Sequence, residues 1–148
     1  MSAFADPAPV ARVVSFYENL SPDGLGRIAE VYAPDAAFKD PFNEVQGLPA
    51  IEGVFRHMYE QVHEPRFRVT GQMAQGQEAW LAWEFRFRFK GWREGETQRV
   101  RGATHLVFAG DGRVQVHRDY WDTGEELYAK LPLLGRLMRW LQRRLSAS

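Results

Sequence analysis

The sequence predicts an α+β fold in which a strongly bent antiparallel sheet wraps around helices from the N-terminal half of the chain. Apolar residues recur at helical spacing up to about residue 62, and after Pro65 they alternate with polar residues. Helices that precede the strands, rather than alternating with them, are typical of α+β folds and not of parallel βαβ sheets. Because each strand has one apolar face, the helices must cover that face.

The helical part contains three patterns. Proline and turn residues separate them, since proline disfavours helix in the residue before it. The third pattern has the clearest apolar stripe, which includes Ile51, Phe55 and Met58. A short strand over residues 36–39 ends at Asp40-Pro41. The predicted helices cover residues 7–20, 22–32 and 47–62.

The strand part has a period of two. Its clearest strand places Trp83, Phe85 and Phe87 on one face, which we expect to point inward. A register slip of one residue would turn every side chain to the other face, so this is a sharp expectation. The other face then carries Glu84, Arg86 and Arg88. The predicted strands cover residues 66–73, 81–90, 100–108 and 113–122, the last after the turn Gly110-Asp111-Gly112.

Composition excludes several classes of function. Nineteen Lys and Arg balance nineteen Asp and Glu, which argues against general binding to nucleic acid. The absence of cysteine excludes disulfides, thiol catalysis and cysteine-ligated zinc. No segment resembles a secretory signal or a run of about 20 apolar residues, so we expect a cytoplasmic protein.

Three pieces of the sequence together resemble a known superfamily. They are Val13-Val14-Ser15-Phe16-Tyr17 followed by Ala33-Pro34-Asp35-Ala36, then Phe38-Lys39-Asp40-Pro41, and finally His117-Arg118-Asp119-Tyr120-Trp121-Asp122. Over about residues 10–123, their order and spacing resemble the nuclear transport factor two-like superfamily in its SnoaL-like and ketosteroid-isomerase-like branch. The resemblance implies a cone-shaped cystatin-like roll. We therefore expect a single domain over residues 1–148, with residues 124–148 as a helical extension.

The resemblance implies two catalytic positions in the first half of the chain. Asp40 matches the general base of ketosteroid isomerases, where partial desolvation makes a carboxylate a better base. Tyr17 matches their tyrosine, which donates a hydrogen bond to the developing oxyanion. The structural alternatives are that Asp40 caps a turn before Pro41 and that Tyr17 lies at the edge of the core.

Two more positions follow from the resemblance of the last strand. Asp119 matches a residue that acts in acid–base chemistry in SnoaL-like cyclases, and His117, on the same face, is a candidate proton relay. The alternative is a structural His–Asp pair. Thr104 stands where the isomerases have a protonated Asp. A hydroxyl is a weaker hydrogen-bond donor to the oxyanion than a protonated carboxyl group. Trp83 and Phe85 stand where the related epoxide hydrolases need an Arg and an Asp, which argues against that reaction.

The expected pocket has mainly apolar walls with few polar groups. Core packing is the alternative role for the same side chains. We expect neither a metal, since no His, Asp and Glu spacing suggests one, nor a redox cofactor. The residues predicted to bind substrate are Trp83, Phe85, Phe87, Thr104, Leu106, Trp121, Phe55 and Met58.

The C-terminal residues 131–145 form a basic amphipathic pattern with Arg136, Arg139, Arg143 and Arg144. Three roles stay open for it: packing on its own sheet or on a dimer partner, closing the pocket as a lid, and lying on a membrane surface, which is the least favoured. We expect a homodimer, since homodimers are the commonest soluble oligomers.

The sequence as a whole favours an enzyme of the isomerase, cyclase or dehydratase type. Such an enzyme would act on a small hydrophobic carbonyl compound by general acid–base catalysis, with Asp40 or Asp119 as the base. The first alternative is a domain that binds a small apolar ligand without catalysis. The second is a dimerisation or membrane-surface module that works through the C-terminal helix.

Overall fold

The computed structural model describes residues 7–127 and 132–146. Its elements follow the predicted order, helices first and strands after. The helices are α1 (Pro7–Glu18), the 3-10 helix η1 (Asp23–Arg27), α2 (Ile28–Val31), α3 (Leu48–Gln61), α4 (Thr123–Glu126) and α5 (Pro132–Leu145). The strands are β1 (Tyr32–Lys39), β2 (Glu44–Gln46), β3 (Val62–Gln75), β4 (Glu78–Phe89), β5 (Gln98–Phe108) and β6 (Val114–Tyr120).

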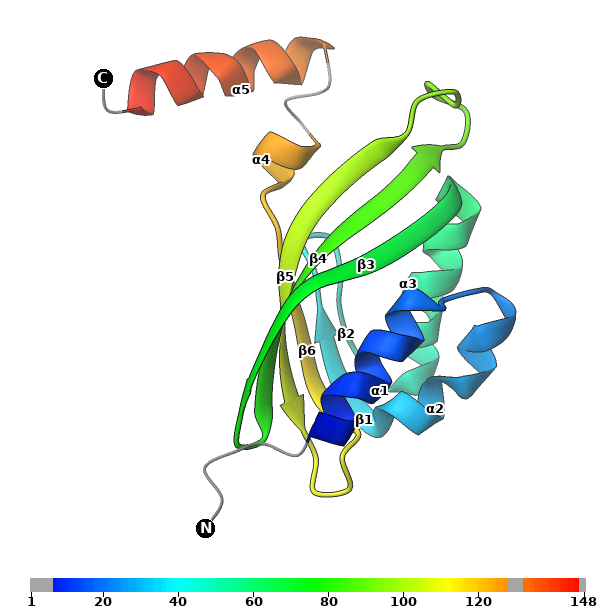
Figure 1. Cartoon of the computed structure of the whole chain (residues 1–148). Helices are drawn as coiled ribbons and strands as arrows, with labels where there is room; N and C mark the ends of the chain where they lie inside the picture. The colour runs from blue at the N-terminus through cyan, green and yellow to red at the C-terminus, as the bar shows by residue number, and fades with distance from the viewer. Residues whose placement is uncertain (1–6, 128–131, 147–148) are drawn as a thin grey trace.

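Six strands form one curled sheet in the order β2-β1-β6-β5-β4-β3. Helices α1, α2 and α3 lie on its concave side, so the predicted wrapping of the sheet around N-terminal helices is confirmed (Figure 1). The sheet is not wholly antiparallel, because β1 pairs with β6 in parallel. Periodicity within a strand carries no information on the direction of its neighbours, and the three-residue strand β2 is too short to show a period.

Two predicted boundaries are corrected. Tyr32, expected at the end of a helix, begins β1. Strand β3 begins at Val62 and so includes Pro65, where its pairing with β4 shifts register. Proline is tolerated there because β3 is an edge strand and the irregularity leaves no ladder hydrogen bond for it to donate. Glu64, at φ 49°, belongs to the same irregularity.

The predicted faces of β4 are confirmed. Trp83 and Phe87 are buried in the core, and Phe85 is partly buried and stacked on Phe67. On the opposite face Glu84 forms ion pairs with Arg86 and Arg99. The core that results is apolar and continuous from the helices into the sheet; its fully buried members include Val13, Leu25, Ile51, Leu106 and Val114.

The convex face of the sheet carries a sheet patch that we define as Met73, Trp80, His105 and Tyr120. Trp80 stacks on His105 with ring centroids 4.7 Å apart, and its ring lies 5.6 Å from that of Tyr120. Met73 pairs with Trp80 across β3 and β4 and is 73% exposed. Exposed apolar clusters of this kind commonly mark interaction surfaces. The homodimer expected from the sequence stays a prediction.

The C-terminal extension contains two helices. Pro132 begins α5, as proline often does in the first turn of a helix. Residues 128–131, within the predicted helical stretch, lie outside the described residues. Helix α5 stands apart from the sheet and from α1, α2 and α3 (Figure 1), and Met138 contacts α4 at Gly124. Within residues 7–127 and 132–146, no helix has the length and apolar character needed to cross a bilayer.

Candidate active site

A buried histidine is the centre of the candidate site. His117 lies on β6, is 2% exposed and stacks on Phe38 with ring centroids 4.6 Å apart. Its Nε2 lies 2.7 Å from Oδ1 of Asp119, two residues further along the same strand face. Its Nδ1 lies 2.8 Å from the hydroxyl oxygen of Tyr32. The ring therefore connects a carboxylate on one side with a phenol on the other.

The strand register extends this network to β5 and β4. Thr104 lies opposite Asp119, and its hydroxyl donates to Asp119 Oδ1 at 2.5 Å. The indole Nε1–H of Trp83 donates to the Thr104 oxygen at 2.7 Å. Asp119 thus receives two hydrogen bonds on one oxygen, whereas its Oδ2 has no hydrogen bond to any described residue. That second oxygen is free to act on another molecule.

The phenol side of the network ends on α1. The Tyr17 and Tyr32 hydroxyls share a short hydrogen bond, and the Tyr17 oxygen lies 3.3 Å from His117 Nδ1. A neutral His117 that carries its proton on Nε2 satisfies every group: it donates to Asp119 and accepts from Tyr32, which accepts from Tyr17. Complete satisfaction of this kind fixes the orientation of all the side chains in a buried polar network.

Burial raises the pKa of both phenols. For Tyr17 the largest cause is desolvation, followed by the nearby Tyr32 and Asp119. For Tyr32 desolvation again raises the pKa, and the hydrogen bond from Tyr17 opposes it only in part. Both groups therefore stay protonated at neutral pH. They are hydrogen-bond donors rather than bases.

The raised pKa values predict a loss of stability at alkaline pH. Tyrosine in the unfolded chain releases its proton near pH 10, whereas the folded chain retains it, so stability is full below about pH 10 and falls above it. We expect a decline of about 1.4 kcal/mol per pH unit for each such tyrosine. Urea unfolding between about pH 9 and pH 11.5 measures the slope. Tyr17→Phe should make the slope shallower, and equal slopes in the two proteins would contradict the assignment.

The cavity beside the network is small. Its volume is about 20 Å³, which is room for about one water molecule. The walls come from α1, β3, β4, β5 and β6. They are formed by Tyr17, Phe67, Val69, Leu81, Trp83, Thr104, His117 and Asp119. Among the described residues the space beside the network is therefore largely filled with side chains, and this cavity is smaller than the deep pocket that the sequence predicts.

Trp83 has the largest side chain among the cavity walls. A Cβ on Gly102 would lie 2.5 Å from the Trp83 ring, so the absence of a side chain at residue 102 gives the indole its place. The indole Nε1–H then donates a hydrogen bond to the Thr104 hydroxyl, which fixes the orientation of the ring. A glycine within a strand often marks such a close approach.

The predicted site residues divide into three groups. Tyr17, His117, Asp119, Thr104 and Trp83 come together around the cavity. Phe55 and Leu106 are buried in the core, and Phe85, Phe87 and Met58 lie in or against it, none of them among the cavity walls. Asp40 and Trp121 instead line an open groove of about 500 Å³.

Asp40 caps a turn, which is the role that the sequence left open as the alternative to a general base. Its Oδ1 accepts from the backbone N–H of Phe42 at 2.8 Å and of Asn43 at 2.6 Å, and both its oxygens accept from the Asn43 amide. The carboxylate is thus the cap of the turn that joins β1 to β2. The groove that Asp40 lines is shared with Asp119, which lines the cavity as well.

Sequence reasoning missed Tyr32, Phe38 and Phe67. Tyr32 falls at the end of a predicted helix, where nothing marks it as a partner of a histidine on the last strand. Phe67 belongs to a correctly predicted strand face, and alternation was the signal that could have added it to the cavity walls. Among residues 7–127 and 132–146, no three His, Asp or Glu side chains gather as metal ligands would.

Comparison with known proteins agrees with the fold. The model of the SnoaL-like domain family matches residues 13–117. A solved structure from Catenulispora acidiphila, with a ketosteroid isomerase-like fold and in complex with trimethylamine, has a TM-score of 0.71 at 19% identity over 86% of this chain and 96% of that one. None of the curated proteins matches the chain in sequence.

Two further solved structures show the range of the fold. A candidate isomerase of the SnoaL-like family from Agrobacterium tumefaciens has a TM-score of 0.62 at 14% identity, over 78% of this chain and 95% of that one. An LEH-like epoxide hydrolase from M. tuberculosis has a TM-score of 0.64 at 15% identity, over 95% of this chain and 93% of that one. At these identities the likeness shows the fold alone, and one fold supports several chemistries.

Proposed function

Since the chain belongs to the SnoaL-like domain family, we propose that it is an enzyme of the isomerase or cyclase type that acts on a small hydrophobic carbonyl compound. Asp119 is the general base, Tyr17 donates a hydrogen bond to the substrate oxygen, and His117 with Thr104 holds the carboxylate in place. Asp40 is not part of the reaction, because its oxygens already hold a turn.

The observation that carries the proposal is the asymmetry of the Asp119 carboxylate. Oδ1 is held by Thr104 at 2.5 Å and by His117 at 2.7 Å, Oδ2 has no hydrogen bond to a described residue, and Asp119 lines the small cavity. A carboxylate fixed by one oxygen presents the other in a defined direction. A general base must first lie within reach of the proton that it removes, and only then does its pKa affect the rate.

The step balances without an external oxidant or reductant. Asp119 Oδ2 takes a proton from the carbon next to the carbonyl, and the electron pair of the broken C–H bond forms a C=C bond. The carbonyl π pair moves to its oxygen, where the Tyr17 hydroxyl turns from Tyr32 to donate to the new enolate. In a β,γ-unsaturated ketone Asp119 then returns the proton to the γ-carbon, the double bond moves into conjugation and the enolate oxygen pair re-forms the C=O bond. In a cyclisation the enolate carbon instead attacks a second carbonyl of the same molecule, whose π pair moves to its oxygen and takes the proton from Asp119.

Entry of a substrate requires a side chain to move, since the cavity holds about one water molecule. Trp83 is the candidate because it fills the cavity and because a single hydrogen bond to Thr104 ties its indole there. Displacing it exchanges that bond for contacts with an apolar ligand. The walls that remain include Phe67, Val69 and Leu81, and these apolar side chains support a hydrophobic substrate class.

The proposal is tested by proton exchange at carbon, which needs no knowledge of the product. A panel of cycloalkanones and β,γ-unsaturated ketones is incubated with the chain in D₂O, and loss of the α-proton signal is followed by NMR. We expect enzyme-dependent exchange for at least one apolar member. Binding detected by saturation transfer without exchange of any bound member would overturn catalysis and favour a binding domain.

A further inference from the structure

We propose that Trp83 sets the size of the substrate: a flat ketone about as large as the indole takes the place of that ring, and a wider ring system is excluded. The inference rests on the proposed function for the reacting group, whereas the place of binding follows from how Trp83 is packed. The substrate class is thereby narrowed to ketones with one ring or with two fused rings.

The indole lies in a slot that three residues define. Trp83 is 9% exposed, so its ring is enclosed by the core. A Cβ on Gly102 would lie 2.5 Å from Cζ2 and Cη2 of the ring, so the backbone of β5 forms one wall of the slot. The ring of Phe67 meets the indole edge to face, with centroids 6.0 Å apart and planes at 79°. At the third wall the indole Nε1–H donates to Thr104 at 2.7 Å, and the other two walls hold the ring by packing alone.

The slot supplies most of the room that a ligand can occupy next to Asp119. The cavity beside the network holds about one water molecule while the indole is in place. Once the indole turns away, the free space is that cavity together with the volume of the ring. The apolar side chains of Phe67, Val69 and Leu81 line the enlarged space. Because protein interiors are closely packed, a ring system wider than the indole would have to displace further side chains.

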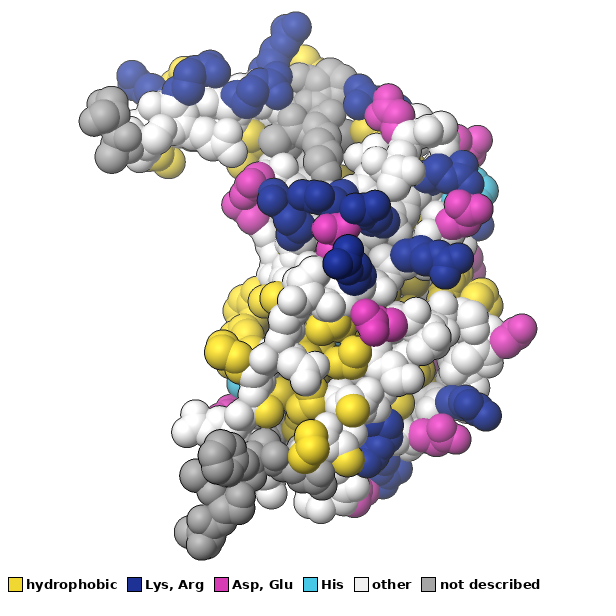
Figure 2. Space-filling model, viewed as in Figure 1, with side chains coloured by type: hydrophobic (Ala, Val, Ile, Leu, Met, Phe, Trp, Pro, Cys, Tyr) yellow, Lys and Arg dark blue, Asp and Glu magenta, His cyan; other side chains and the backbone are white. Residues whose placement is uncertain are grey.

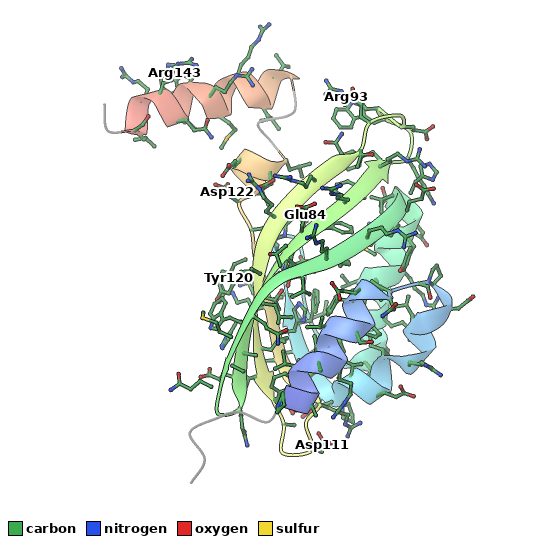
Figure 3. The ribbon with its side chains drawn as sticks, viewed as in Figure 1. Glu84, Arg93, Asp111, Tyr120, Asp122 and Arg143 are labelled. Carbon is green, nitrogen blue, oxygen red and sulfur yellow. The ribbon has the colours of Figure 1, made fainter. Side chains whose placement is uncertain are left out.

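The edge of the indole is close to the open groove that Asp119 lines. The same Cβ on Gly102 would lie 3.0 Å from the Cβ of Trp121, which is a wall of the groove. Asp119 lines the groove and the cavity alike. Tyr120 and Asp122, also walls of the groove, lie on the side of the molecule beneath α5 (Figure 3), and Figure 2 shows an open hollow on that side. The ketone therefore enters from the groove side.

The exchange of indole for ligand leaves no buried donor without an acceptor. Thr104 loses the indole N–H, but its own hydroxyl still donates to Asp119 at 2.5 Å. The indole N–H turns toward the groove, where water accepts from it. A flat apolar ligand restores the packing on Phe67 that the indole gives up. Small size and flat shape are therefore the properties that the slot selects.

The experiment uses the full chain and measures both the affinity for ketones of increasing size and their α-proton exchange in D₂O. The probes are cyclohexanone, 2-tetralone and a tricyclic ketone with a hydrophenanthrene skeleton. We expect the unchanged chain to bind the first two and to discriminate against the third by at least about 10-fold, a usual effect of one group too many in an apolar pocket. Trp83→Ala should remove this discrimination. Trp80→Ala, which removes an exposed tryptophan from the same strand, is the matched control and should leave the discrimination unchanged.

Free indole gives the second readout. Trp83→Ala should bind indole at least about 10-fold more tightly than the unchanged chain does, because a cavity with apolar walls takes up an apolar ring of matching size. Trp83→Phe keeps an aromatic ring in the core and should show a smaller gain. Circular dichroism verifies the fold of each variant, and Trp83→Phe tests the same point if Trp83→Ala does not fold.

The outcomes separate the slot from the reaction. Exchange or binding that does not depend on the size of the ketone would overturn the inference and leave the proposed function standing. Discrimination that both Trp83 variants retain would overturn it as well, and so would the absence of ketone binding to the unchanged chain. Binding that depends on size, without α-proton exchange, would instead support the slot and contradict the assignment of Asp119 as the base.

Discussion

Asp119→Asn is expected to lower the rate of α-proton exchange by about 100- to 10,000-fold, the usual contribution of a positioned general base. An amide has the shape of the carboxylate but cannot take up the substrate proton. Its oxygen still accepts from Thr104 and His117, so the network and the fold survive. The measurement is the exchange rate at saturating ketone, with affinity for the ligand followed separately and expected to change little.

Asp40→Asn is the matched control for that result. Asparagine is also favoured where a side chain caps a turn, so the turn to Asn43 should be retained. We expect the exchange rate to stay within a few-fold of that of the unchanged chain. If Asp40→Asn abolishes exchange and Asp119→Asn does not, the base has been wrongly assigned and the reaction takes place in the open groove.

His117→Ala is expected to lower the free energy of unfolding by about 3–5 kcal/mol, which is the largest stability effect that we predict. The change removes a fully buried ring stacked on Phe38 and leaves a cavity. It also leaves the Tyr32 hydroxyl without its acceptor and takes one of two hydrogen bonds from Asp119. Urea unfolding at pH 7 measures the change as a lower midpoint with an unchanged slope.

Two further variants show which part of the effect belongs to the network. His117→Gln keeps a group that can donate to Asp119 and should recover part of the stability. His57→Ala removes an exposed histidine on α3 and should change the unfolding free energy by less than about 0.5 kcal/mol. A loss for His117→Ala as small as that for His57→Ala would contradict the buried network.

Much of the fold follows from local pattern. The alternation in β4 correctly predicts that Trp83 and Phe87 are buried while Arg86 is exposed, because a strand turns successive side chains to opposite faces. The apolar stripe of α3 correctly predicts the burial of Ile51 and Phe55, because residues at helical spacing lie on one face of a helix. Local pattern fails at Pro65, where the edge position of β3 permits a proline that the interior of a sheet would exclude.

The sequence by itself determined the element types, the buried faces and the short list of polar residues that the site draws on. Only the tertiary structure shows that Asp40 caps a turn, that Asp119 and Tyr32 both contact His117, and that the cavity beside Trp83 is small. Each of these depends on contacts between distant parts of the chain, such as that of Tyr32 with His117, 85 residues away. Periodicity reports which face a side chain occupies, whereas hydrogen bonding and cavity volume depend on what the opposing elements bring to that face.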